Sequence, residues 1–124
     1  MTADTSVPEA PPEAVLIRQL RDRPPRMSRY EAARIAGISE SRWRMIETGT
    51  RWFRGQPLEE PPAPAQTIAR MAWAVGATPA QLTEAGRQDA AAELEAIAEQ
   101  VESTGAFTGR QAKALARRVR RDKP

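Results

Sequence analysis

The spacing of small and helix-capping residues between Ala33 and Ile46 constrains this chain more than any other feature. Ala33 and Gly37 lie four residues apart, and Ser39 follows two residues later, before Trp43 and Ile46. A small Ala lets two helices approach closely, Gly can adopt a positive φ in a tight turn, and Ser can cap the next helix. The sequence therefore predicts two short helices that cross around a tight turn.

Chain length and composition exclude several classes of site. A chain of 124 residues is one domain with appendages, and it can bury one modest core. It has no Cys and no His, which excludes disulfides and thiolate metal sites and removes the commonest general base. It also has no phosphate-binding glycine loop and no carboxylate pair in a recognisable catalytic setting. We expect neither an enzyme nor a bound cofactor or metal.

No segment predicts a membrane protein. The chain has no apolar run of about 18 residues, the length typical of a membrane-spanning helix. Residues 1–12 are rich in Pro, Glu and Ala and do not show the basic-then-apolar order of a signal segment. We therefore expect a cytoplasmic protein without a membrane partner.

The net charge of +3 is small, but it is unevenly distributed. Residues 17–54 hold ten Arg against four acidic residues, and residues 103–124 hold five Arg and two Lys against one Asp. Between these blocks, residues 87–102 hold one Arg against five acidic residues. Two basic blocks around an acidic segment indicate one or two surfaces that bind phosphate. Codon bias would explain the abundance of Arg but not its clustering.

Caps and apolar periodicity divide the chain into helices and connecting segments. Ser28 and Glu31 form a capping box before the second helix, Ser39 begins the third, and Thr78-Pro79 begins the fifth. No alternation typical of strands is present, so we predict an all-α protein. We expect a disordered tail over residues 1–11, a five-helix domain over residues 12–86, and a C-terminal helical hairpin with a basic end over residues 87–124.

Residues 27–49 carry a known motif: Met27-Ser28-Arg29, Ala32-Ala33, Ala36-Gly37-Ile38-Ser39, Trp43, and Ile46-Glu47 before Gly49. This pattern resembles the lambda-Cro-like (xenobiotic-response-element) helix-turn-helix family. Residues 67–82 are similar to that family's fourth and fifth helices, so the resemblance extends over about residues 13–86. Three departures are Trp43 at an aliphatic position, Ala32 at a Leu position, and Met45 where polar residues are common. The larger Trp43 side chain can fill the volume that Ala32 leaves.

The resemblance implies a Cro/repressor-like domain that binds double-stranded DNA and regulates transcription, as a repressor of the phage or prophage type. Its third helix, residues 39–48, is expected in the major groove, where Arg42 or Arg44 can bind guanine and Glu40 can accept from cytosine. The full base-reading set is Glu40, Ser41, Arg42, Arg44 and Met45. The implied phosphate-binding set is Arg29, Ser39, Thr48, Thr50, Arg51 and Arg54.

The long segment at residues 51–64 leaves two alternatives open. Trp52 and Phe53 can form a wing beside the DNA, or they can cover the exposed end of the core. We favour the packing role for these aromatic side chains and DNA contact for Arg51 and Arg54.

The C-terminal region allows several roles. The last helix can make a second DNA contact, cover the acidic residues 87–102, or be solvated. The candidate contact residues are Arg110, Lys113, Arg117, Arg118 and Arg121. Leu94, Ile97 and Val101, with Leu115 and Val119, can form either a homodimer seam or a hairpin in a monomer. The alternative function is a protein-interaction module, an antitoxin or adaptor, that uses this stripe and the acidic segment.

Overall fold

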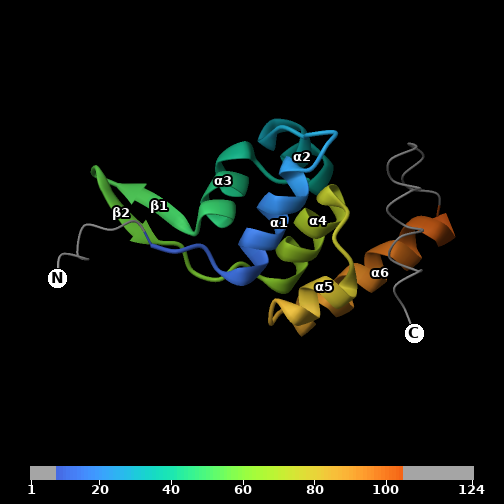
Figure 1. Cartoon of the computed structure of the whole chain (residues 1–124). Coiled ribbons are helices and arrows are strands. Elements are labelled where there is room, and N and C mark those ends of the chain that lie inside the picture. The colour runs from blue at the N-terminus through green and yellow to red at the C-terminus, as the bar shows by residue number, and fades with distance from the viewer. Residues whose placement is uncertain (1–7, 105–124) are drawn as a thin grey trace.

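The computed structural model describes residues 8–104, which form six helices and one two-stranded sheet (Figure 1). The helices are α1 (Pro12–Asp22), α2 (Arg29–Ala36), α3 (Glu40–Thr48), α4 (Ala65–Val75), α5 (Pro79–Glu84) and α6 (Gln88–Thr104). The strands are β1 (Thr50–Phe53) and β2 (Gln56–Glu59). The prediction of a mostly helical protein is confirmed, whereas the strictly all-α prediction is wrong because of this sheet. Within the described residues, no helix has the length and apolarity needed to cross a membrane.

Local capping chemistry fixes the ends of α2 and α3 as the sequence predicts. The Ser28 hydroxyl accepts from the Glu31 amide at 3.0 Å, and the Glu31 carboxylate accepts from the Ser28 amide at 3.5 Å. The Ser39 hydroxyl accepts from the Arg42 amide at 3.0 Å. Gly37 ends α2 with φ +78°, so a connection of only three residues leads from α2 to α3.

Residues 8–11, which we had assigned to a disordered tail, lie along the junction of α3 and β1. Gly49 ends α3 with φ +70°, and a Cβ atom added there would lie 2.9 Å from the Ala10 Cα atom. The Thr50 hydroxyl donates to the Pro8 carbonyl oxygen at 3.5 Å. The close approach of this segment therefore requires a residue without a side chain at position 49. Residues 1–7 lie outside the described part of the chain.

Substitution of the two glycines is expected to separate backbone strain from steric overlap. Gly37→Ala lowers the free energy of unfolding by about 1 kcal/mol, because its positive φ disfavours an L side chain. Apart from its chain neighbours, no described residue has an atom within 4 Å of the new Cβ. Gly49→Ala costs about 1–3 kcal/mol more, because its Cβ also overlaps residues 9–10. Urea unfolding measures both. Equal losses would mean that residues 9–10 do not pack against Gly49.

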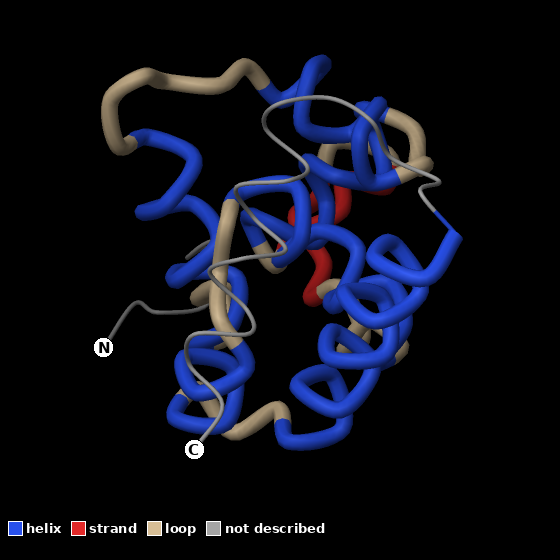
Figure 2. The backbone as a smooth tube through the Cα atoms, turned by 90° about the vertical axis from the view of Figure 1, so that its right-hand side faces the viewer, coloured by secondary structure: helices blue, strands red, loops and turns tan. Residues whose placement is uncertain are grey.

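The six helices pack together (Figure 2), and a single hydrophobic core joins α1, α2, α3 and α4 to α5 and α6. Ile68 and Met71 of α4 lie at its centre, and Trp43 of α3 is fully buried. Leu94 and Val101 of α6 belong to the same core, since α6 packs on α4 and α5. Residue 86 is therefore not a packing boundary, and most of the α6 stripe is not available as a dimer seam. The remaining half of the expected C-terminal hairpin, including Leu115 and Val119, lies outside the described residues.

Most of the segment for which a wing and a cover for the core were the two alternatives forms a β-hairpin. The strands are antiparallel and pair Thr50 with Glu59, and Phe53 with Gln56. Arg54 and Gly55 connect them with φ values of +52° and +76°, as a type I′ turn requires. Trp52 and Phe53 are 64% and 58% exposed, so the expectation that they cover the core is wrong. Their strands extend away from the helices, which removes both rings from the core.

Candidate nucleic-acid interface

The helix α3 presents one polar face to solvent and one apolar face to the core. Trp43, Ile46 and Glu47 are buried, whereas Ser41 and Arg44 are exposed. Helical geometry places Glu40 one turn before Arg44, and the Arg44 Nη2 atom lies 3.5 Å from the Glu40 Oε2 atom. Met45 and Thr48 are half-buried at the same surface. Four of the five expected base-reading residues, Glu40, Ser41, Arg44 and Met45, are therefore brought together.

Arg42 has a different position from the other four. Its Nη1 atom lies 2.8 Å from the Glu60 Oε2 atom, and the Glu60 side chain is only 9% exposed. Arg42 lies half a turn from Arg44, next to the buried Ile46. Arg42 therefore forms an ion pair at the base of the hairpin, whereas the sequence predicts that it reads bases.

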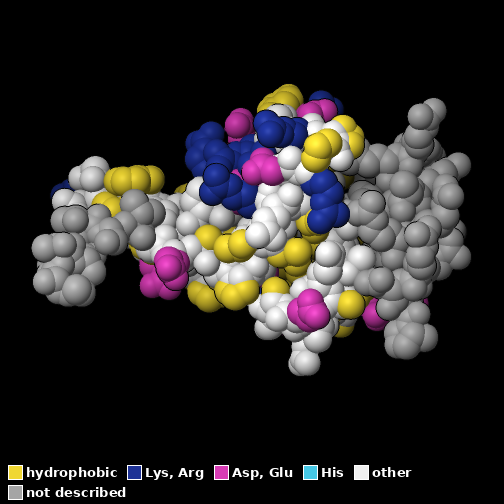
Figure 3. Space-filling model, viewed as in Figure 1, with side chains coloured by type: hydrophobic (Ala, Val, Ile, Leu, Met, Phe, Trp, Pro, Cys, Tyr) yellow, Lys and Arg dark blue, Asp and Glu magenta, His cyan; other side chains and the backbone are white. Residues whose placement is uncertain are grey.

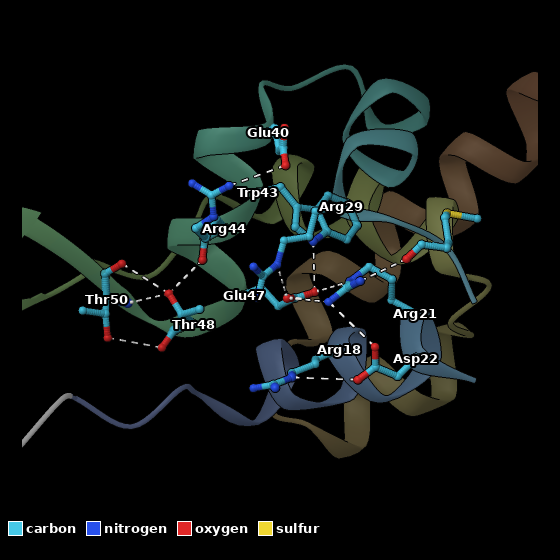
Figure 4. Close-up of polar contacts among 11 residues, drawn as sticks. Arg18, Arg21, Asp22, Arg29, Glu40, Trp43, Arg44, Glu47, Thr48 and Thr50 are labelled. Atoms are coloured by element: carbon cyan, nitrogen blue, oxygen red, sulfur yellow. Dashed lines mark hydrogen bonds and ion pairs between the residues drawn. The ribbon is translucent and has the colours of Figure 1, made fainter. Parts of the chain in front are cut away.

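A buried carboxylate at Glu47 connects α3 to α1 and α2, as Figure 4 shows. Its Oε2 atom accepts from Arg21 Nε at 2.7 Å and from Trp43 Nε1 at 3.0 Å. Its Oε1 atom accepts from Arg21 Nη2 at 3.0 Å and from Arg29 Nε at 2.9 Å. The Glu47 side chain has no exposed surface. Sequence reasoning did not identify this residue as a structural centre, although the Ile46-Glu47 pair was part of the recognised motif.

The electrostatics of this cluster keep Glu47 ionised. Burial alone would raise the pKa of Glu47, but the hydrogen bonds from Arg21, Trp43 and Arg29 outweigh it and leave that pKa below its usual range. The hydrogen bond to Glu47 in turn raises the pKa of Arg21. Both groups therefore carry full charge at neutral pH, and their attraction fixes the orientation of α3 relative to α1.

Arg29, the expected phosphate-binding residue at the start of α2, is held by this cluster. Glu47 accepts from its Nε atom, and 29% of the Arg29 side chain is exposed. The guanidinium group is therefore fixed in position before any ligand binds, while part of it still faces solvent.

The hydroxyl groups expected to bind phosphate are mostly used within the protein. The Thr50 side chain is 4% exposed and its hydroxyl donates to the Pro8 carbonyl oxygen, so the structure does not present this hydroxyl to a phosphate. The Thr48 hydroxyl donates to the Arg44 carbonyl oxygen at 2.8 Å. The Ser39 hydroxyl caps α3, and this residue is exposed at the N-terminus of that helix. An anion could still bind next to Ser39, through the backbone amides at the start of α3.

Arginine side chains gather on the side of the molecule that carries α2 and α3 (Figure 3). The exposed arginines of residues 8–60 are Arg18, Arg23, Arg26, Arg34, Arg44, Arg51 and Arg54. Such a concentration of one charge attracts a polyanion. The expected second contact at Arg110, Lys113, Arg117, Arg118 and Arg121 lies outside the described residues.

Comparison of the chain with protein families, curated proteins and solved structures finds no match. The functional interpretation therefore depends on the exposed face of α3 and on the side chains that surround it.

Proposed function

We propose that this protein binds double-stranded DNA sequence-specifically and regulates transcription as a repressor, with α3 in the major groove. The observation that carries this proposal is the division of α3 into a buried face and an exposed polar face that includes Arg44 and Ser41. A helix fits the major groove, which is about 12 Å wide, and only side chains on its outer face can reach the bases. The adjacent arginines supply the positive charge that such a complex needs.

The side chains on the exposed face of α3 match the hydrogen-bonding groups of base edges. Arg44 can donate two hydrogen bonds to O6 and N7 of a guanine, and Glu40 can accept from the N4 amine of a cytosine. Ser41 can donate or accept, and the apolar Met45 side chain suits the methyl group of a thymine. Because Glu40 lies within 3.5 Å of Arg44, the two can read adjacent base pairs.

Phosphate contacts would position α3 in the groove without reading sequence. Arg29 is held by Glu47 with part of its side chain exposed, and the first turn of α3 follows Ser39, which is exposed, so the amides of Glu40 and Ser41 can donate to a phosphate. These two groups lie on successive helices, so they can contact the backbone on one side of the groove.

The alternative, a protein-interaction module, is less well supported. It requires the apolar stripe of α6 as its binding surface, but Leu94 is fully buried and Val101 is 6% exposed in the core.

Selection of bound duplexes from a random-sequence pool, with the full chain at moderate salt, tests the proposal directly. An enriched sequence motif is the expected result, and its symmetry reports the oligomeric state: a palindrome indicates a dimer and an asymmetric site a monomer. The absence of any enriched motif would overturn sequence-specific binding.

Arg44→Ala is expected to weaken binding to the selected duplex by about 1–3 kcal/mol and to relax the preference at one base pair. The reason is that Arg44 is exposed on the outer face of α3, whereas Arg42, the other arginine of this helix, is held in an ion pair at the base of the hairpin. The matched control is Arg70→Gln, which removes one exposed charge from α4. Fluorescence anisotropy with selected and random duplexes measures the difference. Equal losses of affinity on both duplexes would show that Arg44 does not read a base.

A further inference from the structure

The tip of the β-hairpin combines exposed aromatic rings with two arginines, Arg51 and Arg54, that form no ion pair with any residue of the range 8–104. Residues 51–54 read Arg-Trp-Phe-Arg, and all four are exposed. No acidic residue lies between Arg51 and Glu59 in the sequence. The Arg54 guanidinium carbon lies 5.2 Å from the centre of the Phe53 ring, a distance typical of a cation–π contact. The tip therefore carries both positive charge and apolar surface. It is separate from the face of α3 that we assign to base reading.

The hairpin is fixed to α3 at the base of both strands. At the start of β1, the Thr50 amide donates to the Thr48 hydroxyl at 3.3 Å. After β2, the Glu60 amide donates to the Gly49 carbonyl oxygen at 3.0 Å, and the Glu60 carboxylate binds Arg42 at 2.8 Å. Contacts on both strands prevent the hairpin from rotating freely about Gly49. The position of its tip is therefore set by the position of α3.

The hairpin has the length needed to reach a second groove. Figure 1 shows it projecting from the end of α3 away from the helices. Four residues per strand extend about 13 Å, which is comparable to the width of the major groove at about 12 Å. A tip at that distance from the end of α3 lies near the phosphate backbone and the adjacent minor groove.

We infer that the hairpin tip enters the minor groove beside the major-groove site of α3, an inference that rests on the proposed function. Arg54 occupies the groove, where narrow A·T-rich segments have an enhanced negative potential. Arg51 binds the flanking phosphate, and the exposed rings of Trp52 and Phe53 contact the sugars and base edges as apolar wedges do in other minor-groove proteins. The acidic Glu60 does not oppose this contact, because Arg42 neutralises it.

The experiment measures binding of the full chain to the selected site with an A·T flank, and to the same duplex with 2,6-diaminopurine in place of the flanking adenines. This base adds an amino group to the minor groove and leaves the hydrogen-bonding pattern of the major groove unchanged. The test variant is Arg54→Asn, because Asn before Gly is preferred in a type I′ turn, so the charge is removed while the hairpin is kept. Arg70→Gln is the control for the loss of one charge.

We expect the wild-type protein to bind the modified flank about tenfold more weakly, in the range for one wrongly read base pair. Arg54→Asn should bind the A·T flank about tenfold more weakly than wild type and should not distinguish the two flanks. Arg70→Gln should keep the wild-type preference. If wild type and Arg54→Asn bind both flanks alike, the minor-groove contact is overturned and the aromatic tip is assigned to a protein partner. If the wild-type protein binds no duplex, the proposed function itself fails.

Discussion

Glu47→Gln is expected to lower the free energy of unfolding by about 3–5 kcal/mol, the usual effect of removing one partner from a buried ion pair. The substitution keeps the size of the side chain but removes the carboxylate that both Arg21 and Arg29 contact. Among the described residues, Arg21, which is 12% exposed, then keeps only its long ion pair with Asp22, at 3.9 Å. The substitution also places an amide where Arg21 and Trp43 both donate hydrogen bonds. Since small domains have total stabilities of about 5–15 kcal/mol, the variant should be close to unfolding at room temperature. Urea unfolding followed by circular dichroism measures the loss.

The loss of stability caused by Glu47→Gln should depend on pH. The pKa of Glu47 is lower in the folded chain than in the unfolded chain, so its ion pairs stabilise the fold above the ordinary Glu pKa of about 4.3. That stabilisation is lost as the pH falls through the lower, folded-state pKa. The difference between wild type and Glu47→Gln should therefore be constant near neutral pH and should narrow with increasing acidity.

Glu40→Gln is the matched control for this prediction. Its side chain is 45% exposed and its contact with Arg44 is long, at 3.5 Å, so its removal should change stability by less than about 0.5 kcal/mol. Comparable losses for Glu40→Gln and Glu47→Gln, or a difference that does not change with pH, would contradict the central role of the buried carboxylate.

Affinity for the selected duplex is expected to fall about 10³- to 10⁵-fold between about 50 and 200 mM salt, if about 6–10 phosphates are contacted. The physical reason is that each phosphate contact releases cations condensed on the DNA. This release is more favourable when the salt concentration in solution is low. Among the described residues, the surface near α2, α3 and the hairpin carries exposed arginines that can contact these phosphates. A series of anisotropy titrations at increasing NaCl gives the slope of log affinity against log salt.

Arg29→Gln tests which part of this slope comes from the start of α2. It should reduce the magnitude of the slope by about 1 and weaken selected and random duplexes alike, since a phosphate contact carries no sequence information. A slope close to zero for the wild-type protein would show that binding does not depend on phosphate neutralisation.

The sequence predicted the helix ends well because their causes are local. The capping boxes at Ser28 and Thr78 and the cap at Ser39 each involve residues three positions apart. The positive φ of Gly37 likewise follows from the absence of a side chain. Such features can be read without knowing how the helices pack.

The hairpin could not be predicted in this way. Its strands are four residues long, β2 contains Pro57, and the positive φ values of its turn fall on Arg54 and Gly55. Asn-Gly, the pair that signals a type I′ turn, is absent. Two adjacent aromatic residues, Trp52 and Phe53, also hide the alternation of a strand. The hairpin is therefore determined by its attachment to α3 more than by its own residues.

The ion pairs were missed because their partners are distant in sequence. Glu47 and Arg21 are 26 residues apart, and Arg42 and Glu60 are 18 residues apart. Both pairs depend on how α1, α3 and the hairpin meet in space. This explains why Arg42 was assigned to base reading, and why Glu47 was not identified as the residue that joins three helices.

The separation of the two faces of α3 has a consequence for evolution and engineering. The residues that anchor this helix, Trp43, Ile46 and Glu47, are distinct from Glu40, Ser41 and Arg44, which face solvent. Changes at the three outer positions alter no buried contact, so they should be nearly neutral for folding. A library randomised at those positions alone would yield folded proteins almost throughout, and selection from it could change the sequence preference that we propose for this helix.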